Sequence, residues 1–145
     1  MKKILVQANN LDTVIDVFMY IYLHQGCKKQ DIADYCGFSL RQVDYYVGAC
    51  KYLDLLNSDW TPTDLAIQMF ETRPAEITEC VYERIINDEL MGRIYKKFVD
   101  SPSENHSEFA KKLVTDYYPG LSEAVYIRRS DIIVKWCKKI INYNK

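Results

Sequence analysis

The 145-residue chain has little glycine and proline, five and four residues respectively, and only two histidines. So few glycines leave little material for a glycine-rich phosphate-binding loop, and no such motif is present. No apolar run approaches the roughly 18 residues of a membrane span, and the apolar segment after Met1-Lys2-Lys3 is too short for a signal peptide. We therefore expect a soluble, cytoplasmic protein with no membrane segment.

Metal-ligand patterns are also missing. The five cysteines are widely spaced and odd in number, and they form no CxxC pair and no Cys/His ligand spacing. Cys36, Cys50 and Cys137 fall on predicted apolar helix faces, which is typical of small buried residues in a reducing compartment. We therefore expect no metal and no cofactor.

The sequence shows no catalytic constellation. Restriction nucleases commonly hold metal with an acidic residue followed two positions later by Lys, and this chain has no such pair. His24 falls late in a helical pattern and His106 in a polar loop, and neither has a Ser or Cys nucleophile at a suggestive spacing. The chain is therefore predicted not to be an enzyme. Any nuclease activity in its system would belong to another domain or subunit.

Charge is unevenly distributed along the chain, whose net charge is −1. Residues 1–72 carry 6 basic and 9 acidic side chains, whereas residues 73–145 carry 13 and 11. Residues 122–145 alone hold 6 basic against 2 acidic side chains. This balance argues against a polyanion-binding surface over the whole protein, but it permits a local basic face.

The stretch QDIADYCGFSLRQVDYYVGAC, residues 30–50, has the spacing of two helices joined by a tight turn. Gly37 supplies the turn because it tolerates positive φ, and Ser39 can cap the second helix. Ala33 has to be small because the second helix crosses close to it. The residues expected to face inward are Ile32, Ala33, Cys36, Val43, Val47 and Cys50. The pattern predicts a helix-turn-helix.

A short β-hairpin is expected directly after this pair, with Leu55–Asn57 and Trp60–Thr61 as its arms. In a winged helix this hairpin is the wing. Thr61-Pro62-Thr63-Asp64 then predicts the start of another helix. The later part of the chain repeats the order of a long helix, a short helix, a turn and a long helix that Ser122 can cap. We therefore expect a mainly α fold of tandem winged helix-turn-helix units with a short β-hairpin wing. Residues 1–72 would form the first unit, and residues 73–145 a second helix-turn-helix-like unit packed on it.

The second helix of the first pair is a candidate reading helix. A helical projection places Arg41, Tyr45, Gly48 and Tyr52 opposite the apolar side, flanked by Gln42 and Asp44. Arg41 suits a guanine edge and Gln42 an adenine edge, while Tyr45 suits a phosphate or a thymine methyl. The predicted DNA-binding residues of this helix are Ser39, Arg41, Gln42 and Tyr45. The alternative is a solvated surface helix, and the carboxylate of Asp44 beside Arg41 favours that alternative.

The final helix carries a second candidate set. Arg128, Lys135 and Lys139 fall close together on its projection, with Lys138 to one side, and could neutralise successive phosphates. The alternative is an ordinary charged outer face, since cations near a helix C-terminus are favoured by the helix dipole alone.

The chain resembles the tandem winged-helix DNA-recognition modules found beside or inside prokaryotic type II restriction endonucleases, over roughly residues 11–141. The matching segments are Phe38-Ser39-Leu40-Arg41-Gln42-Val43-Asp44-Tyr45-Tyr46, Lys51-Tyr52-Leu53-Asp54-Leu55-Leu56, Trp60-Thr61-Pro62, Leu121-Ser122-Glu123-Ala124, Arg128-Arg129 and Trp136. Asp54 stands where the family pattern usually has glycine at the end of the reading helix.

The resemblance implies recognition of double-stranded DNA in a restriction-modification system or by a transcriptional regulator. It also implies that a nuclease, a methyltransferase or another protein subunit is a possible partner. The alternative is a protein–protein interaction module on the same fold, with a tyrosine-rich surface formed by Tyr45, Tyr52, Tyr117 and Tyr118. The net acidity of residues 1–72 favours that alternative.

Overall fold

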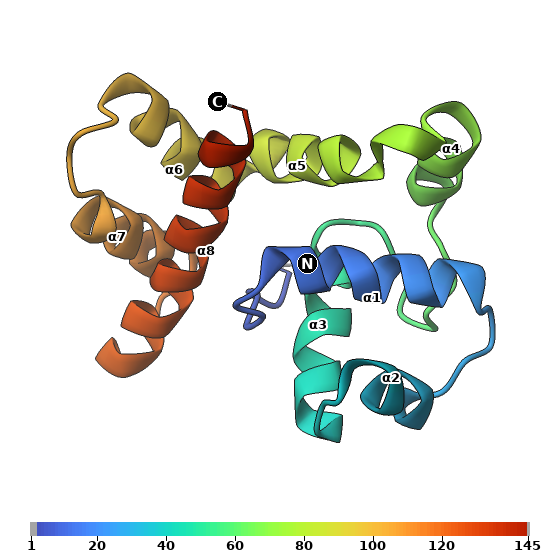
Figure 1. Cartoon of the computed structure of the whole chain (residues 1–145). Coiled ribbons are helices and arrows are strands. Elements are labelled where there is room, and N and C mark those ends of the chain that lie inside the picture. The colour runs from blue at the N-terminus through green and yellow to red at the C-terminus, as the bar shows by residue number, and fades with distance from the viewer. Residues whose placement is uncertain (1–2, 145) are drawn as a thin grey trace. The chain divides into compact units, whose positions relative to one another are not determined.

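The computed structural model describes residues 3–144, and this part of the chain is mainly helical (Figure 1). The helices are α1 (Leu11–Leu23), α2 (Lys29–Cys36), α3 (Leu40–Tyr52), α4 (Asp64–Thr72), the short 3-10 helix η1 (Pro74–Glu76), α5 (Ile77–Asn87), α6 (Glu89–Asp100), α7 (Ser107–Tyr117) and α8 (Glu123–Tyr143). No β-strand occurs among the described residues. None of the helices described there combines the length and the apolarity that a membrane span needs. The mainly α class is confirmed.

The chain forms two compact units, Met1–Val81 and Tyr82–Lys145. The division lies inside α5, later in the sequence than the expected boundary after residue 72. The sequence gives no signal at this point, because α5 is a continuous helix that carries buried residues on both sides of the division, such as Val81 and Ile85.

The first unit is built on α1, α2 and α3, which pack on one another, with α3 running across the direction of α1 (Figure 1). Asn10 begins α1, where its side-chain oxygen accepts a hydrogen bond from the backbone N–H of Thr13 at 3.2 Å. Deep in the core, the Cys50 thiol of α3 lies 3.7 Å from the Val14 carbonyl oxygen of α1. The fully buried side chains of these three helices include Val14, Val17, Phe18, Ile32, Val43 and Cys50.

The corner between α2 and α3 is fixed by backbone geometry and a reciprocal cap. Gly37 ends α2 in the left-handed region with φ 72° and ψ 36°, which favours glycine. Ser39 accepts a hydrogen bond from the N–H of Gln42, and the Gln42 side-chain oxygen accepts one from the N–H of Ser39. Ala33 is buried as expected, whereas Cys36, which was also expected to be buried, is half-exposed at the end of α2.

The expected β-hairpin wing is absent from the described residues. The loop between α3 and α4 contains a single antiparallel bridge, between Leu56 and Pro62. One backbone hydrogen bond lies on each side of it, from the N–H of Asn57 to the Thr61 carbonyl oxygen at 2.8 Å and from the N–H of Thr63 to the Leu55 carbonyl oxygen at 3.2 Å. The pairing extends no further, because α3 ends at Tyr52 and α4 begins at Asp64, which leaves only a few residues on each side of the bridge. The described residues therefore show no β-hairpin wing, only this one bridge at the predicted place.

Two residues of this loop adopt the left-handed conformation although they are not glycine, Asp54 at φ 61° and Trp60 at φ 71°. Asp54 occupies the position at which the resembled family usually has glycine, and Asp is one of the few residues that tolerate this conformation. The Asp59 carboxylate accepts hydrogen bonds from the Thr61 hydroxyl at 2.6 Å and from the Thr61 N–H at 3.1 Å. These bonds hold the loop closed and lower the pKa of Asp59.

The second unit is built on α6, α7 and α8, and the long helix α8 passes alongside both of the others (Figure 1). Gly120, at φ 92°, makes the turn between α7 and α8, and Ser122 caps α8 by accepting a hydrogen bond from the N–H of Val125. The Tyr126 hydroxyl ties this turn down, because it donates to the Tyr118 carbonyl oxygen at 2.7 Å and accepts from the N–H of Leu121. The expected cap and turn are confirmed. The core of the unit includes Met91, Ile94, Val114, Ile133, Trp136 and Ile140.

The two glycines inside helices sit in opposite environments. A Cβ on Gly92 of α6 would lie 2.3 Å from the Ile86 carbonyl oxygen, so only glycine fits where α5 turns into α6. A Cβ on Gly48 of α3 would meet nothing within 4 Å. Packing in the described structure therefore requires Gly92, whereas it does not require Gly48.

This difference predicts opposite effects of the same substitution. Gly48→Ala should raise the free energy of unfolding by about 0.5–1 kcal/mol, because alanine loses less backbone entropy in a helix. Gly92→Ala should lower it by about 1–3 kcal/mol, because the backbone has to move to relieve the overlap. Urea unfolding followed by circular dichroism measures both, and stabilisation by Gly92→Ala would contradict the tight packing of α5 on α6.

Candidate nucleic-acid interface

The N-terminus of α3 brings together the four candidate residues of the first unit. Ser39, Arg41 and Gln42 are exposed and Tyr45 is half-buried. Ser39 and Gln42 already bond to each other's backbone in the cap, so the Gln42 side-chain oxygen is engaged. Its amide N–H groups, and the Ser39 hydroxyl proton, are what these two residues can offer to a ligand.

Arg41 and Tyr45 form a pair one helical turn apart. The Arg41 Nε donates a hydrogen bond to the Tyr45 hydroxyl at 2.6 Å, and the guanidinium carbon lies 5.7 Å from the centre of the Tyr45 ring. A guanidinium has five N–H donors, and this bond uses the one on Nε. The two terminal nitrogens remain as a parallel pair of donors, which is the geometry that recognises two acceptors on one base edge.

The acidic residue beside Arg41 is paired with a neighbouring helix. The Lys29 ammonium of α2 lies 2.8 Å from the Asp44 carboxylate of α3. Both side chains are substantially exposed, so the pair adds little stability, but it offsets the negative charge next to Arg41. In the sequence analysis, the Asp44 carboxylate beside Arg41 argued against DNA contact. The ion pair with Lys29 weakens that argument, and a projection of α3 alone cannot show it.

Tyr52, which the projection placed on the exposed side of α3, is buried. The N-terminal segment covers it: the Lys3 ammonium donates to the Tyr52 carbonyl oxygen at 2.8 Å and lies 4.9 Å from the centre of the Tyr52 ring. A projection treats a helix as isolated, so it missed the contribution of a segment about 50 positions away in the sequence. Tyr52 is therefore not part of an exposed tyrosine-rich surface.

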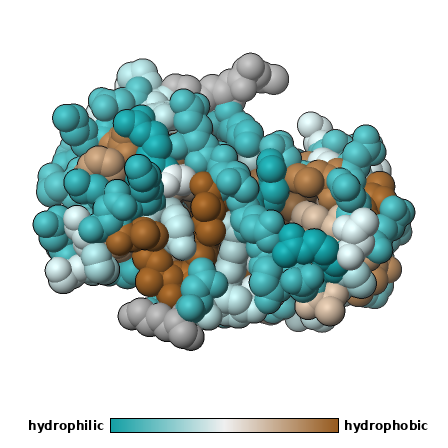
Figure 2. Space-filling view, turned by 90° about the horizontal axis from the view of Figure 1, so that it is seen from above, coloured by the Kyte–Doolittle hydropathy of each residue, from teal (hydrophilic) through white to brown (hydrophobic). Residues whose placement is uncertain are grey.

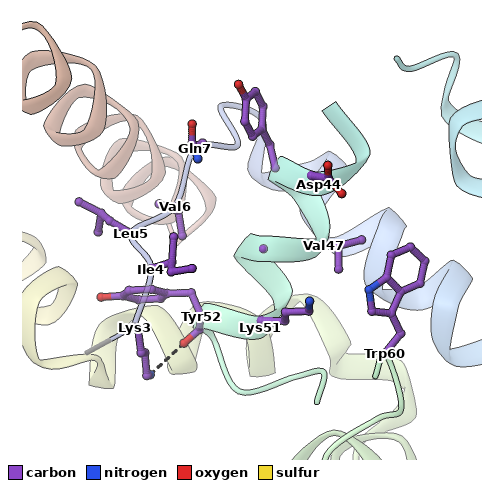
Figure 3. A pocket seen from close by; sticks show the side chains of 12 residues that line it. Lys3, Ile4, Leu5, Val6, Gln7, Asp44, Val47, Lys51, Tyr52 and Trp60 are labelled. Carbon is purple, nitrogen blue, oxygen red and sulfur yellow. Dashed lines mark hydrogen bonds between the residues drawn. The ribbon is translucent and has the colours of Figure 1, made fainter. Parts of the chain in front are cut away.

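A groove of about 360 Å³ lies along the outer side of α3 (Figure 3). α3 forms its floor through Val47, Gly48 and Lys51. The extended N-terminal segment, with Ile4, borders it on one side, and Trp60 of the α3–α4 loop lies on the other. Sequence analysis missed this groove, because its parts come from three separate stretches of chain.

The candidate residues of the second unit lie on α8. Arg128, Lys135, Lys138 and Lys139 are all exposed, as expected for a solvent-facing basic stripe. Asp131, also exposed, lies three residues after Arg128 and four before Lys135, which places its carboxylate on the same stripe. The stripe is therefore basic but contains one acidic side chain, Asp131, which the helical projection of the sequence did not take into account.

The two histidines lie in different environments. His106, expected in a surface loop, is buried: its Nε2 lies 2.7 Å from the Ser101 carbonyl oxygen and its ring packs edge-on against Phe98. His24 is exposed and lies with its Nδ1 2.9 Å from the Tyr20 carbonyl oxygen. Within residues 3–144 no three His, Cys, Asp or Glu side chains are grouped so that they could hold a metal ion.

An exposed aromatic cluster joins α1 to α2. The Tyr20 ring stacks on His24 at 4.2 Å and packs against Tyr35 at 4.5 Å, and Tyr35 is 60% exposed. Leu23, in the same turn of α1, is 66% exposed.

On the face shown in Figure 2, hydrophilic residues dominate and hydrophobic ones gather in a few patches. The tyrosine-rich surface expected from Tyr45, Tyr52, Tyr117 and Tyr118 is less exposed than the aromatic cluster of α1 and α2. Tyr35 is exposed, whereas Tyr52 is buried and the other three are half-buried.

Comparison with known proteins gives a family without an assigned activity. The family model described as Domain of unknown function (DUF7226) matches residues 13–145. The chain belongs to the DUF7226 family. No curated protein and no solved structure gives a match. The matched range covers the first unit from residue 13 onward and the whole of the second unit, and the candidate residues of α3 and α8 all fall within it.

The reactivity of the five cysteine thiols tests which of them are buried. Cys50, Cys80 and Cys137 are buried, and burial raises the pKa of Cys50 and of Cys137 to about 12. Cys27 and Cys36 are half-exposed, with pKa values that burial raises more moderately.

At pH 8 a thiol reagent such as Ellman's reagent should therefore titrate two thiols in the native protein and all five in denaturant, because the thiolate is the reactive form. Raising the pH to 10 should speed the reaction of Cys27 and Cys36, whose thiolate population rises, and leave Cys50 and Cys137 protonated. Rapid native reaction of a third thiol would contradict this arrangement.

Proposed function

We propose that this DUF7226 protein is a cytoplasmic DNA-binding module of two helix-turn-helix units, with α3 as the reading helix and no catalytic activity of its own. The single observation that carries the proposal is the Arg41–Tyr45 pair, which leaves two parallel guanidinium donors exposed at the start of α3. In helix-turn-helix proteins the first turns of the second helix contact base edges. The pair suits the O6 and N7 acceptors of guanine.

Three further features support this role for α3. The Gly37 turn and the Ser39–Gln42 cap set α3 as the second helix of a tight corner. Gly48 leaves the middle of the exposed side without a side chain, which permits close approach of a DNA backbone. The tight α3–α4 loop stands where a winged helix has its wing, and it carries no Lys or Arg, so we assign it no contact with the minor groove.

The basic stripe of α8 would supply phosphate contacts. Arg128 and Lys135 are seven residues apart, which is about 10.5 Å along a helix. Phosphate contacts fix a protein on the duplex without reading sequence, and they make affinity depend on salt. The assignment to a restriction-modification system or to transcriptional control rests on the family resemblance of the sequence. In that setting a nuclease or methyltransferase would be a separate domain or subunit.

A second candidate function is a protein-interaction module, and the exposed cluster of Tyr20, His24 and Tyr35 favours it. Asp31 and Asp34 lie on the same short helix as Tyr35 and are exposed. Aromatic side chains flanked by carboxylates suit a partner with basic residues. This surface belongs to α1 and α2, so it is separable by mutation from the Arg41–Tyr45 pair of α3.

The reading role of Arg41 is tested with duplexes selected from a random pool by the protein itself. Arg41→Ala should weaken binding to a selected duplex by about 1–3 kcal/mol, because two base-edge bonds are lost, and should change binding to a random duplex little. Tyr45→Phe should give a smaller loss, since it keeps the ring but leaves Arg41 unoriented. Fluorescence anisotropy at low salt measures each affinity, and Lys96→Gln on α6 is the control.

Absence of any DNA binding by the wild type at protein concentrations on the order of 100 μM would overturn the proposal. Even non-specific DNA binding has a dissociation constant of about 1–100 μM. Loss of a protein complex on Tyr35→Ser, with no DNA affinity in the wild type, would establish the second candidate instead.

The role of α8 is tested by the salt dependence of the same affinity. Arg128→Gln with Lys135→Gln should lower the slope of log affinity against log salt by about 2, one for each lost phosphate contact. Lys96→Gln with Lys112→Gln removes the same net charge from α6 and α7 and should leave the slope nearly unchanged. Equal slopes for the two double variants would show that overall charge, rather than the α8 stripe, attracts the DNA.

A further inference from the structure

The groove on the outer side of α3 has the character of a small-molecule site. Its volume of about 360 Å³ lies at the lower end of the range typical of ligand pockets. Its surroundings combine aromatic and aliphatic side chains with few polar groups, as ligand pockets do. The aromatic members are Tyr45, Tyr52 and Trp60. Ile4, which is 83% exposed, adds an aliphatic side chain that the described structure leaves uncovered.

The floor of the groove contains a residue that packing does not explain. Gly48 is disfavoured in the middle of a helix, and no neighbour comes within 4 Å of the position of its missing Cβ. The space it leaves open is part of the groove. A larger side chain at this position would project into that space, so glycine keeps the groove free.

One border of the groove is held in a costly conformation. Trp60 has φ 71°, a region that large L-residues rarely adopt. The Asn57 carbonyl oxygen accepts a hydrogen bond from the N–H of Trp60 at 3.0 Å, and the Asp59–Thr61 contacts follow directly. These bonds fix the loop that presents the half-buried Trp60 indole at the groove (Figure 3).

The charges around the groove leave one positive group unmatched. Asp44 is paired with Lys29, and Lys3 lies 3.4 Å from the Asp54 carboxylate. Among the residues that the structure describes, no ion pair or hydrogen bond engages the Lys51 ammonium, and Lys51 is exposed. The site therefore complements a ligand with one negative charge.

From the aromatic lining, the open Gly48 floor and the unmatched Lys51, we propose that this groove binds a small aromatic carboxylate. The ring system lies over Gly48, between Ile4 and Trp60, and the carboxylate accepts a charge-assisted hydrogen bond from the Lys51 ammonium. The ligand is recognised by a planar apolar body and a single anionic group. A cationic or neutral compound of the same shape lacks the bond to Lys51.

The same site would also regulate the proposed DNA binding, and this part of the inference rests on the proposed function. Tyr45 borders the groove and bonds to Arg41, and Gly48 lies on the side of α3 that would face DNA. A ligand over Gly48 occupies space that the duplex needs. Carboxylate binding and DNA binding are therefore expected to exclude each other.

The test uses the full chain labelled with ¹⁵N and two probes of matched shape, naphthalene-2-carboxylate and the neutral 2-naphthylmethanol. The protein has two tryptophans, so the spectrum contains two indole N–H signals. Trp60 borders the groove, whereas Trp136 is fully buried in the second unit and serves as the internal control. The carboxylate should shift the Trp60 signal, leave the Trp136 signal in place, and bind about tenfold more tightly than the alcohol.

Two variants separate the parts of the site. Lys51→Met should abolish the preference for the carboxylate and leave binding of the alcohol within about twofold, because only the charged contact is removed. Gly48→Leu should eliminate the Trp60 shift with both probes, because the side chain fills the groove. An unchanged Trp136 signal and a urea midpoint no lower than that of the wild type show that these variants are folded, and Gly48→Ala provides a second check on the helix.

The proposal is overturned if the two probes bind the wild type equally, if neither shifts the Trp60 signal, or if Gly48→Leu binds as the wild type does. Anisotropy with DNA alone reports separately on the proposed function. Carboxylate binding without DNA binding would leave the ligand site standing and overturn the DNA proposal. If both bind, probe at ten times its dissociation constant should weaken DNA binding about tenfold by mass action, and an unchanged DNA affinity would overturn mutual exclusion.

Discussion

The arrangement of the first unit depends on the corner between α2 and α3. Gly37 provides the left-handed residue that ends α2, and two residues later the reciprocal bonds of Ser39 and Gln42 start α3. Because so few residues separate the helices, their directions are set locally, and the small side chain of Ala33 lets them pack closely. Everything that the exposed side of α3 presents, including Arg41 and the groove over Gly48, follows from that fixed direction.

Cap geometry and functional surface compete for the same residues at this corner. Gln42 serves the cap with its side-chain oxygen, which leaves Arg41 as the residue best able to recognise a base edge. Tyr45 in turn serves both Arg41 and the groove. Because Tyr45 belongs to both sites, a ligand in one site affects binding at the other. This coupling is the physical basis of the proposed exclusion between a small anion and DNA. The α8 stripe shares no residue with this surface.

Several local features could be predicted from sequence because they depend on neighbours in the chain. Ser39 and Ser122 cap helices, and Gly37 and Gly120 make turns, since each needs only the backbone within a few residues. The helical class and the burial of Val43, Val47 and Cys50 follow from periodicity in the same way. The predicted hairpin is reduced to a single bridge, because α3 and α4 are so close in the chain that only a few residues remain on each side of it.

The helices, their caps and the exposed position of Arg41 can be predicted from the amino-acid sequence alone, because helical hydrogen bonds and caps act over three or four residues. Which of the residues expected at the surface are covered, and which charges are paired, depends on packing between distant segments. Lys3 covers Tyr52, Lys29 pairs with Asp44, and Ile4 and Trp60 border Gly48. Each of these contacts joins segments that are far apart in the chain or lie on different helices. Periodicity within one helix carries no information about which distant segment will pack against it.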